Sequence, residues 1–291
     1  REILGIKVQG NISSIAKVAA RFNARHVIIA LPFAENTQLR FILDLANRSG
    51  LHVLKVPSAE DLMSGRLNVS QIRRFEVEDL LGRDAVNLDS SGLAGQINGQ
   101  SILVTGAGGS ICSELCRQII KFQPKELICF DISELGLYKL DEEFSGKDLK
   151  IVCVVGDVKN ATRLNQLFVE HQPQLVFHAA AYKHVPLMES GNVYEAISNN
   201  VLGTFTLVNA CKLAGVDKFI LISTDKAVKS TNVMGATKNL AEMVCQGLQA
   251  ESGTQFVTVR FGNVLGSSGS VIPKFREQIK IGGPVTVTHQ D

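Results

Sequence analysis

The sequence lacks the cysteine and histidine spacing of a metal centre. Its six cysteines are scattered through apolar periodic segments, no Cys-x-x-Cys pair occurs, and no histidine cluster accompanies them. Cysteines used in this way are small core residues of a protein in a reducing compartment. Cys112 and Cys116 share one helix face, but two ligands do not make a metal site, so no metal is expected.

Long apolar runs and an excess of one charge are also missing. No stretch approaches the ~20 apolar residues that a membrane span needs, and no signal-peptide pattern is present. The 30 basic and 28 acidic residues leave a net charge of +2, with no basic stripe for nucleic acid. With 291 residues and 45% hydrophobic content, the chain can bury one large core or two modest ones.

Residues 1–90 alternate short apolar runs with helical periodicity. The predicted strands are Ile3–Val8, Val27–Leu31 and Val53–Val56, and the predicted helices are Ile12–Phe22 and Thr37–Arg48. This alternation indicates a small parallel βα layer without a phosphate loop or paired catalytic groups.

A polar, glycine-containing stretch follows this first unit. Residues 91–100 lie within it and are predicted to be a linker. The second unit, residues 101–291, then opens with a strand, Ile102–Thr105, and a helix, Ile111–Ile120.

Three glycines join that strand to that helix. Gly106, Gly108 and Gly109 allow a tight turn and a close approach of backbone to a pyrophosphate, and the helix N-terminus supplies free N–H groups. A second strand, Glu126–Phe130, ends in Asp131, near the spacing expected for a carboxylate that binds the adenosine ribose. Because a carboxylate disfavours a 2′-phosphate, NAD is expected rather than NADP. An empty Rossmann-like crevice is the alternative.

One position departs from the dinucleotide-binding pattern. Cys112 stands where a third glycine is usual, at the point where the helix packs on the strand. Its side chain should move the helix outward or require a smaller neighbour, which puts cofactor affinity in question.

The next strand ends carry further polar and small residues. Ile151–Val155 leads to Asp157, which can bond an adenine amino group, and Leu175–His178 leads to three alanines with room for a flat ligand. Tight helix packing explains the alanines equally simply. His178 is interpreted as a core histidine. A helix over Val193–Leu213 carries Asn199 and Asn200 at mid-span, either buried near a cofactor or facing solvent.

The stretch from Phe219 to Lys238 brings together an acid–base set. An apolar strand, Phe219–Ile222, delivers Thr224, Asp225 and Lys226 at its carboxyl end, where open parallel sheets bind ligands.

With this stretch in place, the chain resembles the extended short-chain dehydrogenase/reductases. Within them it is similar to the CapD-like nucleotide-sugar 4,6-dehydratases of bacterial polysaccharide biosynthesis, whose members are often membrane-anchored. The resemblance rests on Val-Thr-Gly-Ala-Gly-Gly-Ser-Ile, Phe-Asp-Ile-Ser-Glu, His-Ala-Ala-Ala-Tyr-Lys-His-Val-Pro-Leu-Met-Glu, Ser-Thr-Asp-Lys-Ala-Val, Asn-Val-Met-Gly-Ala-Thr-Lys and Arg-Phe-Gly-Asn-Val-Leu-Gly-Ser-Ser-Gly-Ser-Val.

The resemblance implies an α/β fold: a doubly wound parallel Rossmann sheet, preceded by a smaller, incomplete Rossmann-like domain. It further implies a dehydratase that acts on UDP-N-acetylglucosamine with tightly held NAD. The implied catalytic residues are Thr224, Asp225, Lys226, Met234 and Lys238. The implied cofactor contacts are Gly106, Gly109, Ser110, Ile111, Asp131, Ser133, Asp157, Val158, Ala179, Ala180, Ala181, Asn200 and Lys238. The substrate contacts are Lys183, His184, Glu189, Asn263, Val264, Ser268, Gly269, Ser270 and Val271.

Met234 changes the expected chemistry. The wider superfamily has a catalytic tyrosine four residues before the lysine, and the spacing to Lys238 is kept here without the phenol. A thioether cannot donate or accept the proton, so we assign Asp225 as acid and Lys226 as base. Asp225, or a water in the space of the phenol, would take the proton of the sugar 4-hydroxyl.

The resemblance also implies that the chain is a soluble piece of a longer protein. The parent would lie at the cytoplasmic side of the inner membrane, would bind a UDP-sugar and no nucleic acid, and would form homo-oligomers. Two other functions stay open: a nucleotide-sugar 4-epimerase or reductase, and a regulator that binds NAD without turnover.

Overall fold

The chain divides into two units, residues 1–87 and 88–291, each considered by itself. The computed structural model describes residues 2–31, 36–56, 73–74, 90–264, 267 and 271–287. Within these ranges, no helix combines the length and the apolar character that a bilayer crossing requires. The six cysteines are free thiols, and all except the partly exposed Cys153 are buried, which confirms their prediction as core residues.

The first unit contains the predicted βα layer. Its elements are β1 (Glu2–Ile3), β2 (Ile6–Lys7), η1 (Ile12–Ser14), α1 (Ile15–Phe22), β3 (His26–Ile29), α2 (Asn36–Arg48), β4 (His52–Lys55) and β5 (Arg73–Arg74). Strands β3 and β4 are parallel, and β5 adds an antiparallel edge. A small core of Ile29, Leu39 and Ile42 holds the helices on this sheet.

The prediction of one strand over Ile3–Val8 is wrong. Two short antiparallel strands, β1 and β2, replace it. Leu4 and Gly5 both have positive φ and form the turn between them, and glycine adopts that backbone conformation without steric cost.

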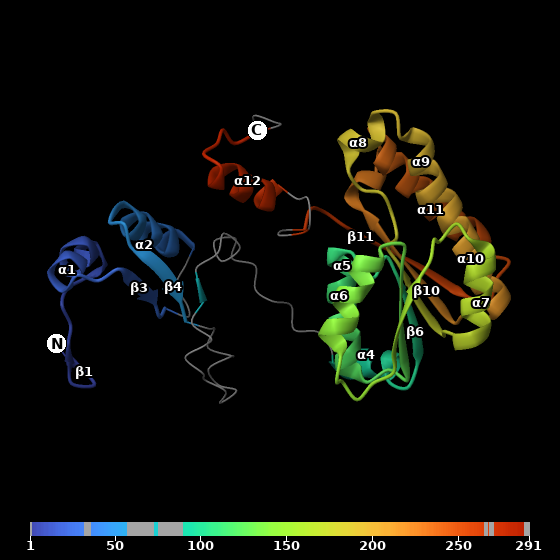
Figure 1. Ribbon diagram of the computed structural model, residues 1–291, viewed down its shortest axis with the longest axis horizontal. Helices are drawn as coiled ribbons and strands as arrows, with labels where there is room; N and C mark the ends of the chain where they lie inside the picture. The colour runs from blue at the N-terminus through green and yellow to red at the C-terminus, as the bar shows by residue number, and fades with distance from the viewer. Residues whose placement is uncertain are drawn as a thin grey trace. The chain divides into compact units, whose positions relative to one another are not determined.

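The second unit, coloured from green to red in Figure 1, is built on a six-stranded parallel sheet. The strand order is β11-β10-β9-β6-β7-β8. Its strands are β6 (Ser101–Thr105), β7 (Glu126–Asp131), β8 (Ile151–Val155), β9 (Leu175–His178), β10 (Lys218–Thr224) and β11 (Gln255–Phe261). Its helices are α4 (Ser90–Ile97), α5 (Ser110–Ile119), η4 (Ile120–Phe122), α6 (Glu134–Phe144), α7 (Ala161–His171), α8 (Val185–Glu189), α9 (Val193–Ile197), η5 (Ser198–Leu202), α10 (Gly203–Ala214), η6 (Asp225–Ala227), α11 (Val233–Gln249) and α12 (Val271–Lys280).

Two hydrophobic cores cover the two faces of this sheet. Successive strand side chains point to opposite faces, so Ile102 and Val104 pack toward α5 and α6 while Leu103 packs toward α7, α10 and α11. Helices on both faces of a parallel sheet define a doubly wound fold. The predicted fold class of the second unit is therefore confirmed.

The interpretation of residues 91–100 as a linker is wrong in part, because α4 occupies Ser90–Ile97. Ile97 is buried against α5 and α6. The glycines in this segment made it look like a loop, although an isolated glycine costs a helix only about 1 kcal/mol.

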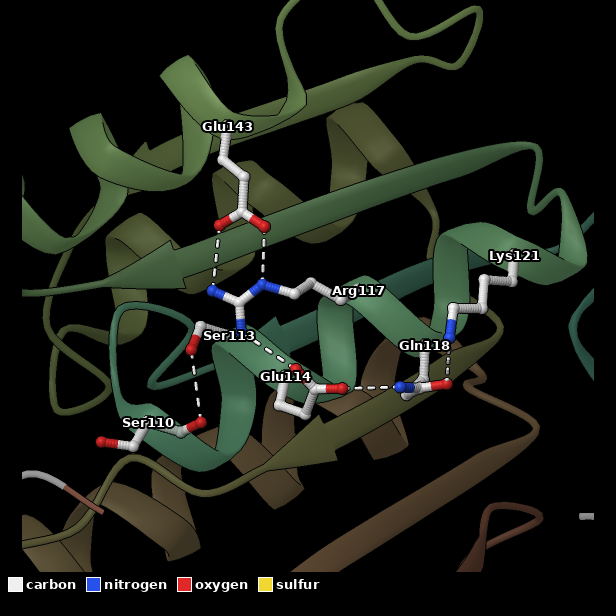
Figure 2. A network of polar contacts seen from close by, with 7 residues as sticks. All are labelled: Ser110, Ser113, Glu114, Arg117, Gln118, Lys121 and Glu143. Carbon is white, nitrogen blue, oxygen red and sulfur yellow. Dashed lines mark hydrogen bonds and ion pairs between the residues drawn. The ribbon is translucent and has the colours of Figure 1, made fainter. Parts of the chain in front are cut away.

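Helix α5, which begins at the glycine loop, is tied to α6 by a fork-shaped ion pair (Figure 2). The Arg117 Nε and Nη2 atoms donate to the two Glu143 carboxylate oxygens at 2.6 and 2.9 Å, and Nη1 donates to Glu114 at 3.0 Å. Ser113 at the start of the helix donates to the Ser110 carbonyl. Because these groups are partly exposed, we expect the pair to contribute about 1 kcal/mol at most, but it fixes the direction of α5.

Candidate functional site

A cavity of about 640 Å³ lies at the carboxyl ends of the strands of the second unit. Most predicted site residues line it: Gly106, Gly109, Ser110, Ile111, Asp131, Asp157, Val158, Ala179, Ala180, Ala181, Lys183, His184, Thr224, Lys226, Met234, Lys238, Asn263 and Val264. The fold therefore brings together groups that are spread over about half of the sequence.

The glycine loop is shaped for close approach. Gly106 has φ +73°, and a Cβ added there would lie 2.8 Å from the Ala180 backbone nitrogen. Added to Gly108, it would lie 2.9 Å from the Gly136 Cα at the start of α6. These positions need glycine for two reasons, a left-handed backbone at the first and backbone contact at both.

Asp131 closes this loop from the end of β7. Its Oδ2 accepts the Gly108 N–H at 2.9 Å and its Oδ1 accepts the Ser133 N–H at 2.8 Å. Ser133, which was expected to contact a cofactor, caps α6 by accepting the Gly136 N–H at 3.1 Å. The loop, the carboxylate and the helix start thus hold one another in place.

The Cys112 side chain packs closely beside the glycine loop. The side chain is 1% exposed and its Sγ donates to the Thr105 carbonyl at 3.5 Å, on the strand that precedes the glycines. Burial raises the pKa of Cys112 to about 12, so the thiol is neutral. The departure from glycine is accommodated by a contact between the helix and the strand.

His178 is a core residue, as predicted. Its ring nitrogens lie 2.7 Å from the Thr105 hydroxyl and 2.9 Å from the Thr204 hydroxyl. Burial, with a smaller effect of the Lys238 charge, lowers the pKa of His178 to about 3. A neutral histidine with both nitrogens occupied is a structural group.

Asn200 holds the loop that follows β9. Its Oδ1 accepts from the Tyr182 N–H, and its Nδ2 donates to the Tyr182 carbonyl and to the Thr237 hydroxyl, at 2.8 to 3.0 Å. Asn199 donates to the same Oδ1. The predicted single helix over Val193–Leu213 contains the π-helical turn η5 at this point, which points both amides inward. Asn200 therefore anchors Tyr182 and α11, instead of offering free donors to a cofactor.

Three other predicted contacts have partners in the protein. Glu189 accepts the Val233 N–H at 2.6 Å and thereby caps α11. Asp157 accepts the Lys159 N–H and forms an ion pair with the Lys159 ammonium at 2.8 Å. The Lys226 ammonium donates to the Asn263 Oδ1 at 2.8 Å. Ser268, Gly269 and Ser270 lie outside the described residues, and of Val271 only the backbone at the start of α12 is described.

Asp225 does not line the cavity, although its neighbours Thr224 and Lys226 do, and its side chain is 59% exposed. Its Oδ1 accepts from the Thr224 hydroxyl at 3.0 Å and from the Lys226 ammonium at 3.3 Å. These two hydrogen bonds, Thr224 first, lower the pKa of Asp225. The carboxyl is therefore ionised, and a proton must reach it before it can act as an acid.

Lys238 and Met234 form the buried wall next to these groups. Both are 6% exposed on α11, one helical turn apart. Burial lowers the pKa of Lys238 to about 8, and the neighbouring Glu242 carboxylate acts in the opposite direction. An ammonium that is easily deprotonated thus faces the cavity beside an inert thioether.

The sequence interpretation missed the polar contacts below this wall. Glu242 of α11 accepts hydrogen bonds from Ser223 of β10 and from Arg260 of β11. The available signal was a carboxylate on the buried face of a helix, four residues after Lys238.

The chain is similar to several known proteins. The family model described as "Polysaccharide biosynthesis protein" matches residues 102–291. "Capsular polysaccharide biosynthesis protein CapD" of Staphylococcus aureus is 49% identical over 98% of this chain and 48% of its own length. "UDP-N-acetylglucosamine 4,6-dehydratase (inverting)" of Campylobacter jejuni is 34% identical over 66% of this chain and 58% of its own.

An epimerase and a solved structure match over a similar range. "UDP-glucose 4-epimerase" of Rickettsia massiliae is 35% identical over 65% of this chain and 56% of its own. The crystal structure of Pen from Bacillus thuringiensis is 35% identical, with a TM-score of 0.61, over 64% of this chain and 57% of that one. The chain spans about half the length of the first curated relatives that it matches.

Proposed function

The chain belongs to the polysaccharide biosynthesis protein family, and from that premise we propose that it is a nucleotide-sugar 4,6-dehydratase. The substrate we propose is UDP-N-acetylglucosamine, and the product is its 4-keto-6-deoxy derivative. One observation carries the proposal: Met234 lines the cavity where a phenol would serve an epimerase, and the Asp225–Lys226 pair stands beside it with proton-carrying groups. Loss of water across C5–C6 needs such an acid and base.

NAD is the cofactor that we propose for this cavity, and the residues present fit it. Gly106, Gly109 and Ser110 line the cavity at the α5 N-terminus, whose backbone N–H groups would bind the pyrophosphate of the cofactor. A Cβ added at Gly106 would clash with the Ala180 backbone, so glycine is what lets the loop pack closely there. Asp131 would bind the adenosine ribose, and Lys238 would hold the nicotinamide ribose. When bound, NAD supplies reversible hydride transfer at the sugar.

The protein's own groups then have distinct tasks. Thr224 would orient the sugar 4-hydroxyl, and the ionised Asp225 would accept its proton. Asp225 thereby becomes the acid that later protonates the departing 6-hydroxyl. Its lowered pKa in the free protein means that it starts as the anion that can take this proton. Lys226, held by Asn263 at 2.8 Å, would remove the C5 proton. Lys183, His184 and Val264 would bind the nucleotide-sugar.

Incubation with UDP-N-acetylglucosamine tests the proposal directly. We expect a product lighter than the substrate by one water, detected by mass spectrometry after separation of the nucleotide-sugars. A product of unchanged mass but altered retention would instead show epimerisation, the function of the similar Rickettsia protein. An unaltered substrate in the presence of bound NAD would favour a regulator and contradict the proposal.

We also propose that the second unit associates with a second copy of itself. Helix α11 lies beside α9, η5 and α10. Figure 1 shows α9, α10 and α11 together at one side of the second unit. Several exposed apolar residues belong to these helical segments. These are Tyr194, Ile197, Leu202, Phe205, Leu240 and Met243. Since large side chains each bury about 150–250 Å² when covered, half-exposed ones offer roughly 500 Å² per copy. Pairing two copies would approach the ~1,200 Å² of stable interfaces.

Replacing Leu240 by glutamate should separate this pair. A charge at the centre of an apolar contact loses hydration without gaining a partner, so we expect the dimer to dissociate at least tenfold more readily. Sedimentation velocity over a range of concentrations measures the change. Val169→Glu is the control, because Val169 is an exposed apolar residue on α7. A wild-type protein that stays monomeric, or equal dissociation of both variants, would contradict the proposal.

A further inference from the structure

Glu242 is a buried carboxylate that the reaction does not use. Its side chain is 3% exposed. The Arg260 Nε donates to both carboxylate oxygens at 2.9 and 3.1 Å, Arg260 Nη2 donates to Oε2, and the Ser223 hydroxyl donates to Oε1. Although burial alone raises the pKa of Glu242, the hydrogen bonds from Arg260 and Ser223 hold it below the ordinary value. Glu242 is therefore an anion inside the fold.

The three residues belong to three elements next to the proposed catalytic groups: β10, which leads into η6, the edge strand β11, and α11. Ser223 directly precedes Thr224 in β10, and Arg260 is its partner across the parallel ladder in β11. Glu242 follows Lys238 by one turn of α11. The network thus lies one layer below the catalytic edge, where a second contact, Lys226 to Asn263, joins the same two strand ends.

Strand β11 needs such a tie because it is the edge of the sheet. Among the residues that the structure describes, it pairs with β10 alone, so ladder hydrogen bonds hold it from one side. Asn263, the Lys226 partner, follows directly after this strand. A shift of β11 against α11 would therefore move the Lys226 ammonium.

We propose that the Ser223–Glu242–Arg260 network is a positioning device for catalysis: it fixes the ends of β10 and β11 against α11. The network thereby fixes the positions of Lys226 and Asn263 relative to Met234 and Lys238, which line the same cavity. This proposal rests on the proposed dehydratase function, because the network would position Lys226 and Lys238 for that reaction. Glu242 and Arg260 are positioning residues, since the contacts described for them are to protein groups.

The same carboxylate acts on Lys238 through its charge. The ionisable groups near Lys238 are Glu242 and Cys245 on α11, Cys112 on α5 and the neutral His178 on β9. Of these, Glu242 carries the negative charge, because burial keeps the two thiols protonated. Removing that charge should lower the pKa of Lys238 below its value of about 8. The basic limb of the pH–rate profile, where a needed ammonium is lost, would then move to lower pH.

Two variants test the network, Glu242→Gln and Arg260→Lys. Glu242→Gln keeps an acceptor for the Ser223 hydroxyl but removes the negative charge. Arg260→Lys keeps the positive charge but removes the paired hydrogen bonds of the guanidinium to the carboxylate. We expect kcat to fall about 10- to 100-fold in both, with KM for UDP-N-acetylglucosamine changed less than about threefold. In Glu242→Gln alone, the basic limb of the pH–rate profile should also move to lower pH. Amide hydrogen exchange of residues 224–228 and 261–263 should become faster, while that of β6 and β7 stays unchanged.

Glu251→Gln is the matched control. It breaks an ion pair with Lys212 just beyond the C-terminal end of α11, so it should change neither kcat nor exchange at the catalytic edge. Wild-type kcat and exchange in both network variants would overturn the proposal, as would faster exchange spread evenly over β6 and β7. If the wild-type protein does not dehydrate the sugar but local exchange still increases, the fixing of the strand ends stands and the dehydratase function fails.

Discussion

Replacing Lys226 by methionine is expected to abolish the incorporation of solvent deuterium at C5 of the sugar. Methionine has a similar length but carries no exchangeable proton, so the C5 proton has no acceptor. Loss of a general base costs a factor of about 10² to 10⁴ in rate. Mass spectrometry of the nucleotide-sugar recovered from D₂O measures the exchange. NAD binding should remain, because the glycine loop and Asp131 hold one another without Lys226.

Lys229→Met is the control for this experiment. Lys229 lies three residues further along, is exposed, and is not part of the cavity wall. The variant keeps the Cβ at a position with φ 50°, so backbone strain there is unchanged. Both variants lose one positive charge from the same loop, and only Lys226→Met loses the ammonium held by Asn263. Undiminished C5 exchange in Lys226→Met would refute the assignment of Lys226 as base.

The strands of the second unit could be predicted to within two residues because their patterns are local. Runs such as Ile102–Thr105 and Leu175–His178 are continuous and largely apolar, as expected for strands buried on both faces. The glycine loop could be predicted equally well, because its turn and the start of the following helix are adjacent in sequence. Cavity residues at strand ends followed from the topology of open parallel sheets.

The contacts that sequence reasoning missed are non-local or depend on side-chain detail. Glu242 meets Ser223 and Arg260 only because strands β10 and β11 align those two residues, and neither periodicity nor composition indicates that register. The role of Asn200 likewise depended on a π-helical turn, which rotates its amide toward Tyr182. Helix α4 was hidden by glycines that tertiary packing of Ile97 overrides.

Replacing Gly235 by alanine is expected to reduce kcat about 100-fold while NAD stays bound. A Cβ at this position would lie 2.3 Å from the Lys226 carbonyl oxygen and 3.0 Å from its carbonyl carbon. Both atoms are backbone, so the added methyl group must push η6 away from α11. That displacement moves Lys226 and Asp225 relative to Lys238, and misplacement by about 1 Å costs roughly 10²-fold in rate. Steady-state kinetics and NAD titration measure the two effects.

Gly247→Ala on the same helix makes the comparison decisive. Nothing lies within 4 Å of a Cβ added there, so alanine should raise helix stability by about 1 kcal/mol. The intrinsic preference for alanine is the same at both positions, whereas overpacking at Gly235 costs about 1–3 kcal/mol. The difference between the two variants therefore isolates the contact of α11 with the Lys226 backbone. Equal kcat in both variants would show that this contact does not position the base, and the close approach of glycine to carbonyl would then serve packing alone.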